Sequence, residues 1–471
     1  MRPDADTPTS VSEQELRDEA SKKPPIEKIV VAIHGIGNQL RSQTIRSVAQ
    51  RFGDRLDPPL PVMPLGFFNL GNDASVRVSR LNVPADSELA GIGFAEVFWA
   101  DIPVQVVKAN DTLEETKAWG RTVVSRAEAE YCRNVPGGTL TRKDFQLGVG
   151  VVEEIVETVD VLEKLLYVTA AAGLFKFELK SLLRDYAGDV QLVTDFPYYR
   201  QKIIHRFHKA MHEILQAYDQ IWPNRDPGPE IYVVAHSEGT VISFLSLLQA
   251  LAGVPVRDPD EDPRHADPVD SSWLRHVRGF MTIGSPIDKH LVLWPGLWEG
   301  LALRSHVDAR GGVVMDDRPG PAVLPQPIRW RNYYDLGDPI GFQLDTALDF
   351  LHEKGCRAFE FDADRHDIGF SRYWLPGKAH NDYWTDSEVF GHFIDDVVSP
   401  VPGHEAQRPQ GSWLRDKASL AIPYVCVFLL HVLGVFVFYK AVIDDKLLAH
   451  LPREVAQVGL LLTCVTVAGR L

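Results

Sequence analysis

The sequence has few cysteines and no excess of basic residues. Its 471 residues include only 4 cysteines; Cys132 and Cys356 are far apart, and Cys426 and Cys464 lie in apolar runs. So few cysteines exclude a disulfide framework and favour a reducing compartment. The formal net charge is −15, and no basic stripe is visible along the chain. Nucleic acid is therefore not an expected partner, because binding to phosphates needs such a stripe.

An apolar leader is also missing at the N-terminus. Residues 1–25 are polar and punctuated by proline, without the apolar core that a signal peptide needs. We expect this segment to be disordered. With no signal peptide, the main domain is expected to be cytoplasmic.

The C-terminal region contains what the rest of the chain lacks, a long apolar run. Residues 418–439 read ASLAIPYVCVFLLHVLGVFVFY, without Lys, Arg, Asp or Glu. About 20 apolar residues cross a bilayer, and this run has no polar face. We therefore expect 418–471 to anchor the protein in a membrane. The second run, 455–469, is shorter than a full span and fits a hairpin arm, a half-buried segment or a truncated span. Orientation stays open because the flanking positive charges are balanced.

Between the two ends, strand patterns alternate with helical ones. Strand-like runs lie at 26–39, 76–83, 93–101, 230–236, 277–286 and 328–335, and helical patterns at 42–56, 240–253 and 386–398. This alternation predicts an α/β domain over 26–398, with a mostly parallel sheet and helices on both faces. A Pro/Gly-rich linker is expected at 399–417.

Residues 103–226 interrupt this alternation and are expected to form a largely helical insertion. One face of its last helix carries the apolar side chains Ile203, Ile204, Phe207, Met211, Ile214, Leu215 and Tyr218. The histidines at 205, 208 and 212 match no metal motif, and we expect them to be solvated. No metal or other cofactor is expected, since the Gly-containing stretch 148–154 lacks the third glycine and the preceding strand of a nucleotide loop.

The segment EIYVVAHSEGTVISF (230–244) places a serine between a strand and a helix. A tight strand-to-helix turn exposes such a serine and aims the helix N-terminus at the reacting oxygen. Backbone segments meet at this turn, so the positions two residues before and two after the serine must be small. Here they are Ala235 and Gly239. The pattern predicts that Ser237 is a nucleophile.

At these residues the chain resembles the α/β-hydrolase superfamily, in particular its lipase and serine-esterase branches. Four motifs within 26–398 carry the resemblance: AHSEG at 235–239, HGIGNQ at 34–39, NYYDLGDPIG at 332–341 and AHNDYW at 379–384. The resemblance implies an α/β-hydrolase fold with Ser237 as nucleophile and His380 as general base. It also implies an oxyanion hole made by the backbone N–H groups of Ile36 and Glu238. His34 is expected to be a structural hydrogen-bonding residue.

Two aspartates near the end of the strand at 328–335 compete for the role of the triad acid. Asp338 precedes a proline, as in an Asp-containing turn of lipases, whereas Asp335 ends the strand. We favour Asp338, with Asp335 as the alternative and Asp382 as second choice. Ser285 also follows a strand, but Pro286 removes the N–H that an oxyanion hole needs there. Ser285 is therefore expected to be a turn residue near the site.

Three functions follow from these motifs. The first is a membrane-attached serine hydrolase that cleaves carboxylic esters or thioesters, such as a lipase or phospholipase acting on lipid acyl groups. The second is a catalytically inactive hydrolase fold that serves as a membrane scaffold or binding protein. The third is an acyltransferase that uses the same triad. Head group, oligomeric state and protein partners stay open.

Overall fold

The computed structural model describes mainly residues 25–56, 65–68, 78–103, 113–134 and 190–412, with short gaps inside these ranges. Residues 1–24 of the predicted disordered segment 1–25 lie outside the described residues, as do the apolar runs at 418–439 and 455–469. Among the helices that are described, none combines the length and apolarity of a membrane-spanning segment.

The chain divides into two units, which are described separately below. The larger unit comprises Met1–Tyr334, Ile340–Gly369 and Asp382–Pro409. The smaller unit comprises Asp335–Pro339, Phe370–Asn381 and Gln410–Leu471.

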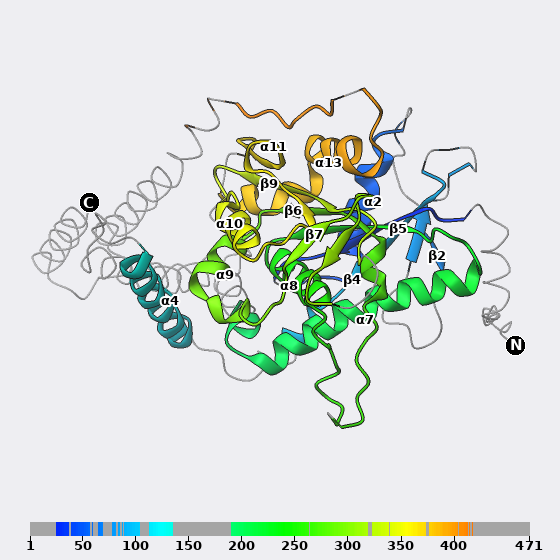
Figure 1. Ribbon diagram of the computed structural model, residues 1–471. Coiled ribbons are helices and arrows are strands. Elements are labelled where there is room, and N and C mark those ends of the chain that lie inside the picture. Colours follow the sequence, from blue (N-terminus) through cyan, green and yellow to red (C-terminus); the bar gives the residue numbers. More distant parts are fainter. Residues whose placement is uncertain are drawn as a thin grey trace, which may run out of the picture. The chain divides into compact units, whose positions relative to one another are not determined.

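A mostly parallel sheet forms the centre of the larger unit (Figure 1). Its strands are β1 (Lys28–Ile33), β2 (Leu65–Phe68), β3 (Val78–Leu81), β4 (Ile92–Val97), β5 (Glu230–His236), β6 (Val277–Ile283), β9 (Ile328–Asp335), β10 (Phe359–Glu360) and β11 (Asp367–Phe370). Their order is β10-β9-β6-β5-β1-β4-β3-β2, with β11 paired to β9. The strands from β10 to β4 run parallel, and β3 and β2 follow antiparallel. The prediction of a mostly parallel sheet is confirmed.

The register of the central strands aligns their carboxyl ends. Ile33 of β1 pairs with Ala235 of β5, and His236 of β5 pairs with Ile283 of β6. β1 and β5 are buried along nearly their whole length, which explains their continuous apolar sequences. The residues that follow these strands therefore emerge at one edge of the sheet.

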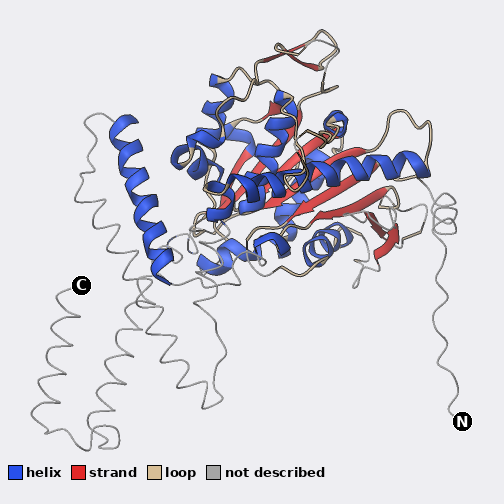
Figure 2. Cartoon of the chain, turned by 90° about the horizontal axis from the view of Figure 1, so that it is seen from below, coloured by secondary structure: helices blue, strands red, loops and turns tan. Residues whose placement is uncertain are grey.

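Helices cover both faces of this sheet. The helices of the larger unit are α2 (Gln43–Gly53), α4 (Leu113–Asn134), α7 (Pro197–Ile221), α8 (Glu238–Ala252), α9 (Ile287–Leu293), α10 (Asp345–Glu353), α11 (Ala363–His366) and α13 (Ser387–Phe393), with the short η1 (Ser272–His276), η2 (Pro295–Leu297), η3 (Asp382–Thr385) and η4 (Ile394–Val398); the smaller unit contains α12 (Pro376–Asn381). α7 and α8 lie on one face, and α2 and α13 lie on the other (Figures 1 and 2). A separate hairpin pairs β7 (Ser305–Val307) with β8 (Val313–Met315).

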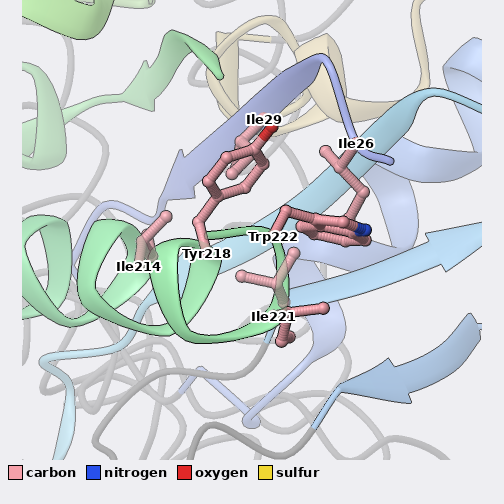
Figure 3. Close-up of a pocket in the computed structure, with 7 residues that line it drawn as sticks. Ile26, Ile29, Ile214, Tyr218, Ile221 and Trp222 are labelled. Atoms are coloured by element: carbon pink, nitrogen blue, oxygen red, sulfur yellow. The ribbon is translucent and has the colours of Figure 1, made fainter. Parts of the chain in front are cut away.

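α7 shows how the helical pattern produces packing. Ile214 and Tyr218 on its inner face lie against Ile26 and Ile29 near the start of β1 (Figure 3). The cavity left between them is about 10 Å³, barely enough for a single water, so this part of the core is filled.

One prediction for α7 was wrong. His208, expected to be solvated, is 1% exposed and packs edge-on against the Trp273 ring at 5.3 Å. Burial lowers the pKa of His208 to about 3, so the imidazole is a neutral core group. The error arose because the apolar face of α7 is wider than the 3.6-residue pattern of its aliphatic side chains indicates.

Candidate active site

The turn after β5 holds its serine in a strained conformation. Ser237 has φ 53° and ψ −131°, which residues other than glycine rarely adopt. Its N–H donates to the carbonyl of Ile283 on β6 at 3.0 Å, and its own carbonyl accepts from the N–H of Thr240 at 2.9 Å. α8 begins at the next residue, Glu238. The strain persists because a strand holds the turn on one side and a helix holds it on the other.

Glycines surround this turn where backbone segments meet. A Cβ on Gly239 would lie 2.4 Å from the carbonyl oxygen of His34, which is closer than any side chain tolerates. A Cβ on Gly35 would lie 2.6 Å from the Cβ of Ser237 and 3.2 Å from its Oγ. The His-Gly loop after β1 therefore lies directly against the serine, and sterics account for the glycine two residues beyond it.

His34 is a structural residue of this loop, as predicted. Its Nε2 accepts from the backbone N–H of Trp99 at 3.1 Å, so the ring hydrogen is on Nδ1, which lies 2.6 Å from the carbonyl oxygen of Gly35. The Trp99 indole N–H donates to the His34 carbonyl at 3.0 Å. Burial lowers the pKa of His34 to about 4, against the opposing effects of the Gly35 carbonyl and Asp101. The imidazole is neutral and fixes the loop.

The two predicted oxyanion donors belong to this same region. Ile36 is half-buried in the loop, while Gly37 and Asn38 lie outside the described residues. Glu238 is the first residue of α8, and backbone N–H groups in a first helical turn have no partner within the helix. The roles of these two N–H groups as oxyanion donors stay predictions.

The smaller unit contains the predicted base and acid. Nδ1 of His380 lies 3.0 Å from both Oδ1 and Oδ2 of Asp338. The Asp338 side chain is fully buried and that of His380 is 12% exposed. Because a carboxylate can only accept, the hydrogen of the neutral His380 imidazole lies on Nδ1.

The alternative acid is engaged elsewhere within this unit. The carboxylate of Asp335 accepts hydrogen bonds from three backbone N–H groups: that of Gly337 at 2.8 Å, that of Arg372 at 2.7 Å and that of Tyr373 at 3.3 Å. Burial raises the pKa of Asp335, while these backbone bonds oppose the rise. Asp335 thus organises the loop, and the geometry favours Asp338 as the partner of His380.

Ser285 lies at the neighbouring strand end, as predicted. Its Oγ is 2.8 Å from Oγ1 of Thr240, which donates at 2.7 Å to the carbonyl of Ser237. Beside it is an open hollow of about 420 Å³. Val292 and Phe342, both more than a third exposed, are among the apolar side chains that line it. The hollow is of the size and character of small-molecule sites.

Sequence reasoning missed several neighbours of the serine. Thr240 was read only as a helix residue. The rings of Tyr383 and Trp384 lie 6.0 and 5.4 Å from the ring of His236, the residue before the nucleophile. The side chain of Glu238 pairs with a histidine on α9. Only the aromatic pair carried a sequence signal, since it lies within the AHNDYW motif at 379–384.

Comparison with protein-family models, with curated proteins and with solved structures finds no match to this chain. Among the described residues, no group of three His, Cys, Asp or Glu side chains is arranged to hold a metal ion.

Proposed function

We propose that this protein is a serine hydrolase of the α/β-hydrolase type, which cleaves carboxylic esters through an acyl-enzyme on Ser237. One observation carries the proposal: Ser237 has a positive φ in a turn between a parallel strand and a buried helix, with the Gly35 backbone packed against it. A residue kept in such a strained conformation is a signal of function, because a cap or turn role does not require it.

The chemistry follows from the groups already described. Nε2 of His380 takes the hydroxyl proton of Ser237 as Oγ attacks the ester carbonyl. Asp338 holds the ring by its Nδ1–H and stabilises the imidazolium. The N–H groups of Ile36 and Glu238 bind the oxyanion, and the imidazolium then protonates the leaving alcohol. Water enters, and the same steps in reverse order release the acid.

Two features support an ester of a lipid-like acid. The hollow beside Ser285 is lined partly by Val292, Leu293 and Phe342, which suits an apolar acyl group. The apolar run at 418–439 favours attachment to a bilayer, where a tethered enzyme meets lipid at high effective concentration.

Hydrolysis of esters with short, medium and long acyl chains, and of phospholipids, tests the proposal. We expect the full chain in detergent to hydrolyse a subset of these. Ser237→Ala and His380→Ala should each lose about 10⁴-fold in kcat, while the matched control Ser285→Ala should stay within about threefold of the wild type. Hydrolysis that survives in folded Ser237→Ala would contradict the proposal.

A further inference from the structure

A buried acid–base pair lies behind the nucleophile turn. Oε1 of Glu238 lies 3.2 Å from Nε2 of His290 on α9, and the two residues are 1% and 3% exposed. The Trp294 ring lies 5.2 Å from the imidazole, and the Trp298 indole donates to the His290 carbonyl at 3.2 Å. Burial of two charges costs several kcal/mol, and their attraction seldom offsets the cost. A contribution to the stability of the fold therefore does not explain why the chain contains this buried pair.

The contacts of the ring indicate where the proton lies. Nδ1 of His290 is 3.1 Å from the carbonyl oxygen of Pro286, which can only accept, and Nε2 faces the carboxylate of Glu238. An imidazole with an acceptor at each nitrogen carries two hydrogens. Burial by itself would lower the pKa of His290, but the carboxylate and the Pro286 carbonyl outweigh it, and the pKa is raised. The pair is thus an imidazolium facing a carboxylate.

The position of the acid makes its charge important. Glu238 is also the residue whose backbone N–H we assign to the oxyanion hole, so its side chain is anchored one residue from the proposed nucleophile. At an effective dielectric constant of about 20, an unneutralised carboxylate roughly 7 Å from a developing oxyanion slows the reaction on the order of 50-fold.

We propose that His290 is an electrostatic positioning residue for the nucleophile turn, whose imidazolium neutralises the Glu238 carboxylate so that negative charge can develop on the substrate oxygen. The proposal rests on the proposed function, and it adds a residue on α9 to the serine, histidine and acid that the sequence motifs supply. In this role His290 touches neither substrate nor Ser237.

Other charged groups surround the pair from several elements. Lys289 adjoins His290 on α9 and opposes its protonation, and Asp288 faces α10 by accepting from its first backbone N–H groups. Arg126 of α4 lies over the Trp294 ring, and the carboxylate of Asp195 accepts a hydrogen bond from the indole N–H of Trp294. All four stay in place in the variants below, so a loss of rate that appears when His290 is replaced and disappears when Glu238 is replaced as well reports the Glu238 carboxylate.

The rate of labelling by a fluorophosphonate tests the proposal, because phosphonylation of Ser237 also builds charge on an oxygen in the oxyanion hole. Relative to the wild type, His290→Gln should label more slowly as the pH rises, to on the order of 50-fold more slowly at high pH, because a carboxylate without a neutralising partner opposes the oxyanion only while it is charged. Glu238→Gln/His290→Gln should recover most of that loss. In ester hydrolysis the loss should fall on kcat and leave KM nearly unchanged.

A merely structural role predicts a different pattern. His208→Gln, which removes another buried histidine, should show no such loss of rate and serves as the matched control. A double variant as slow as His290→Gln, or a rate of the single variant relative to the wild type that does not depend on pH, would overturn the proposal. If the single variant unfolds at high pH while the double variant stays folded, the pair acts in stability and the electrostatic role is also overturned. No labelling of Ser237 in the wild type would instead refute the proposed function, and the role of His290 with it.

Discussion

The adjacent parallel strands β5 and β6 are each followed by a turn that contains a serine. The two turns differ in which residue has the strained backbone conformation. After β5 the positive φ falls on the serine itself, at 53° for Ser237. After β6 it falls on the preceding glycine, at 58° for Gly284, and Ser285 follows. Ser285 then accepts from the N–H of Ile287 at the start of α9, at 3.3 Å. The strained residue of the first turn is the serine itself, whereas the second serine accepts a hydrogen bond from the first residue of the next helix.

The difference between the two turns shows that a serine at the carboxyl edge of a sheet is not a nucleophile by its position alone. Both serines are buried, at 2% and 1% exposure, and a single hydroxyl, that of Thr240, links them. After β5 the residue that follows the serine, Glu238, has a backbone N–H, whereas after β6 that position is occupied by Pro286, which has none. Strain on the serine and a backbone N–H directly after it are thus features of the β5 turn that the β6 turn lacks.

The pKa values of the two histidines near these turns, His34 and His290, are shifted in opposite directions. His34, beside the β5 turn, accepts from a backbone N–H and is neutral. His290, on the helix after the β6 turn, faces a carbonyl and a carboxylate, which raise its pKa. Burial acts in the same direction on both, and the type of partner decides the outcome.

The largest effect on stability that we expect from this contrast appears when the pH is lowered. The pKa of His34 is about 4 in the folded protein, against about 6.5 when unfolded. Above pH 6.5 its contribution is complete. As pH falls toward 4, only the unfolded state takes up the proton, so the unfolding free energy drops by roughly 3 kcal/mol. His290 has the opposite sign: its contribution is present below pH 6.5 and is lost as pH rises through its raised pKa.

Urea unfolding at several pH values between about 7.5 and 4.5 measures this. His34→Gln should lose less stability over that range than the wild type, by about 1.4 kcal/mol for each pH unit. His208→Gln, which removes another histidine of lowered pKa, should flatten the profile in the same way. Identical pH profiles for all three proteins would contradict the assignment of neutral buried histidines.

A smaller effect isolates the strain itself. Ser237→Gly should raise the unfolding free energy by about 1 kcal/mol relative to Ser237→Ala, because only glycine relaxes at a positive φ. Gly284→Ala should lower it by about 1–2 kcal/mol. At Ser285 the Gly and Ala variants should show no such advantage for glycine. Thermal unfolding of the matched pairs checks this, and equal stability of the two Ser237 variants would mean that the turn is unstrained.

Much of the fold could be predicted because its central strands are continuous runs of apolar, β-branched residues. The strands at 230–236 and 328–335 match their predicted bounds, and the helix predicted at 240–253 ends at Gly253, whose φ of 69° suits a C-cap. The short pieces were missed: β10 has two residues, and the β7–β8 hairpin has three on each side. Segments this short are defined by tertiary pairing, which leaves no periodicity in the sequence.

The candidate site also has a part that could be predicted from the sequence and a part that could not. Ser237, Gly239 and the loop at 34–36 were predictable because a tight turn restricts residue size locally. The preference for Asp338 over Asp335 could only be guessed, since both follow the same strand and differ in which hydrogen bonds they accept. The Glu238–His290 pair left no signal, because 52 positions separate residues that meet only in three dimensions.

The mass of the intact protein after reaction with a fluorophosphonate, followed by mapping of the modified peptide, tests the central claim most directly. The account predicts one adduct on Ser237 in the wild type and in Ser285→Ala, and none in folded Ser237→Ala. Labelling of Ser285, or a wild-type protein that stays unmodified, would contradict it.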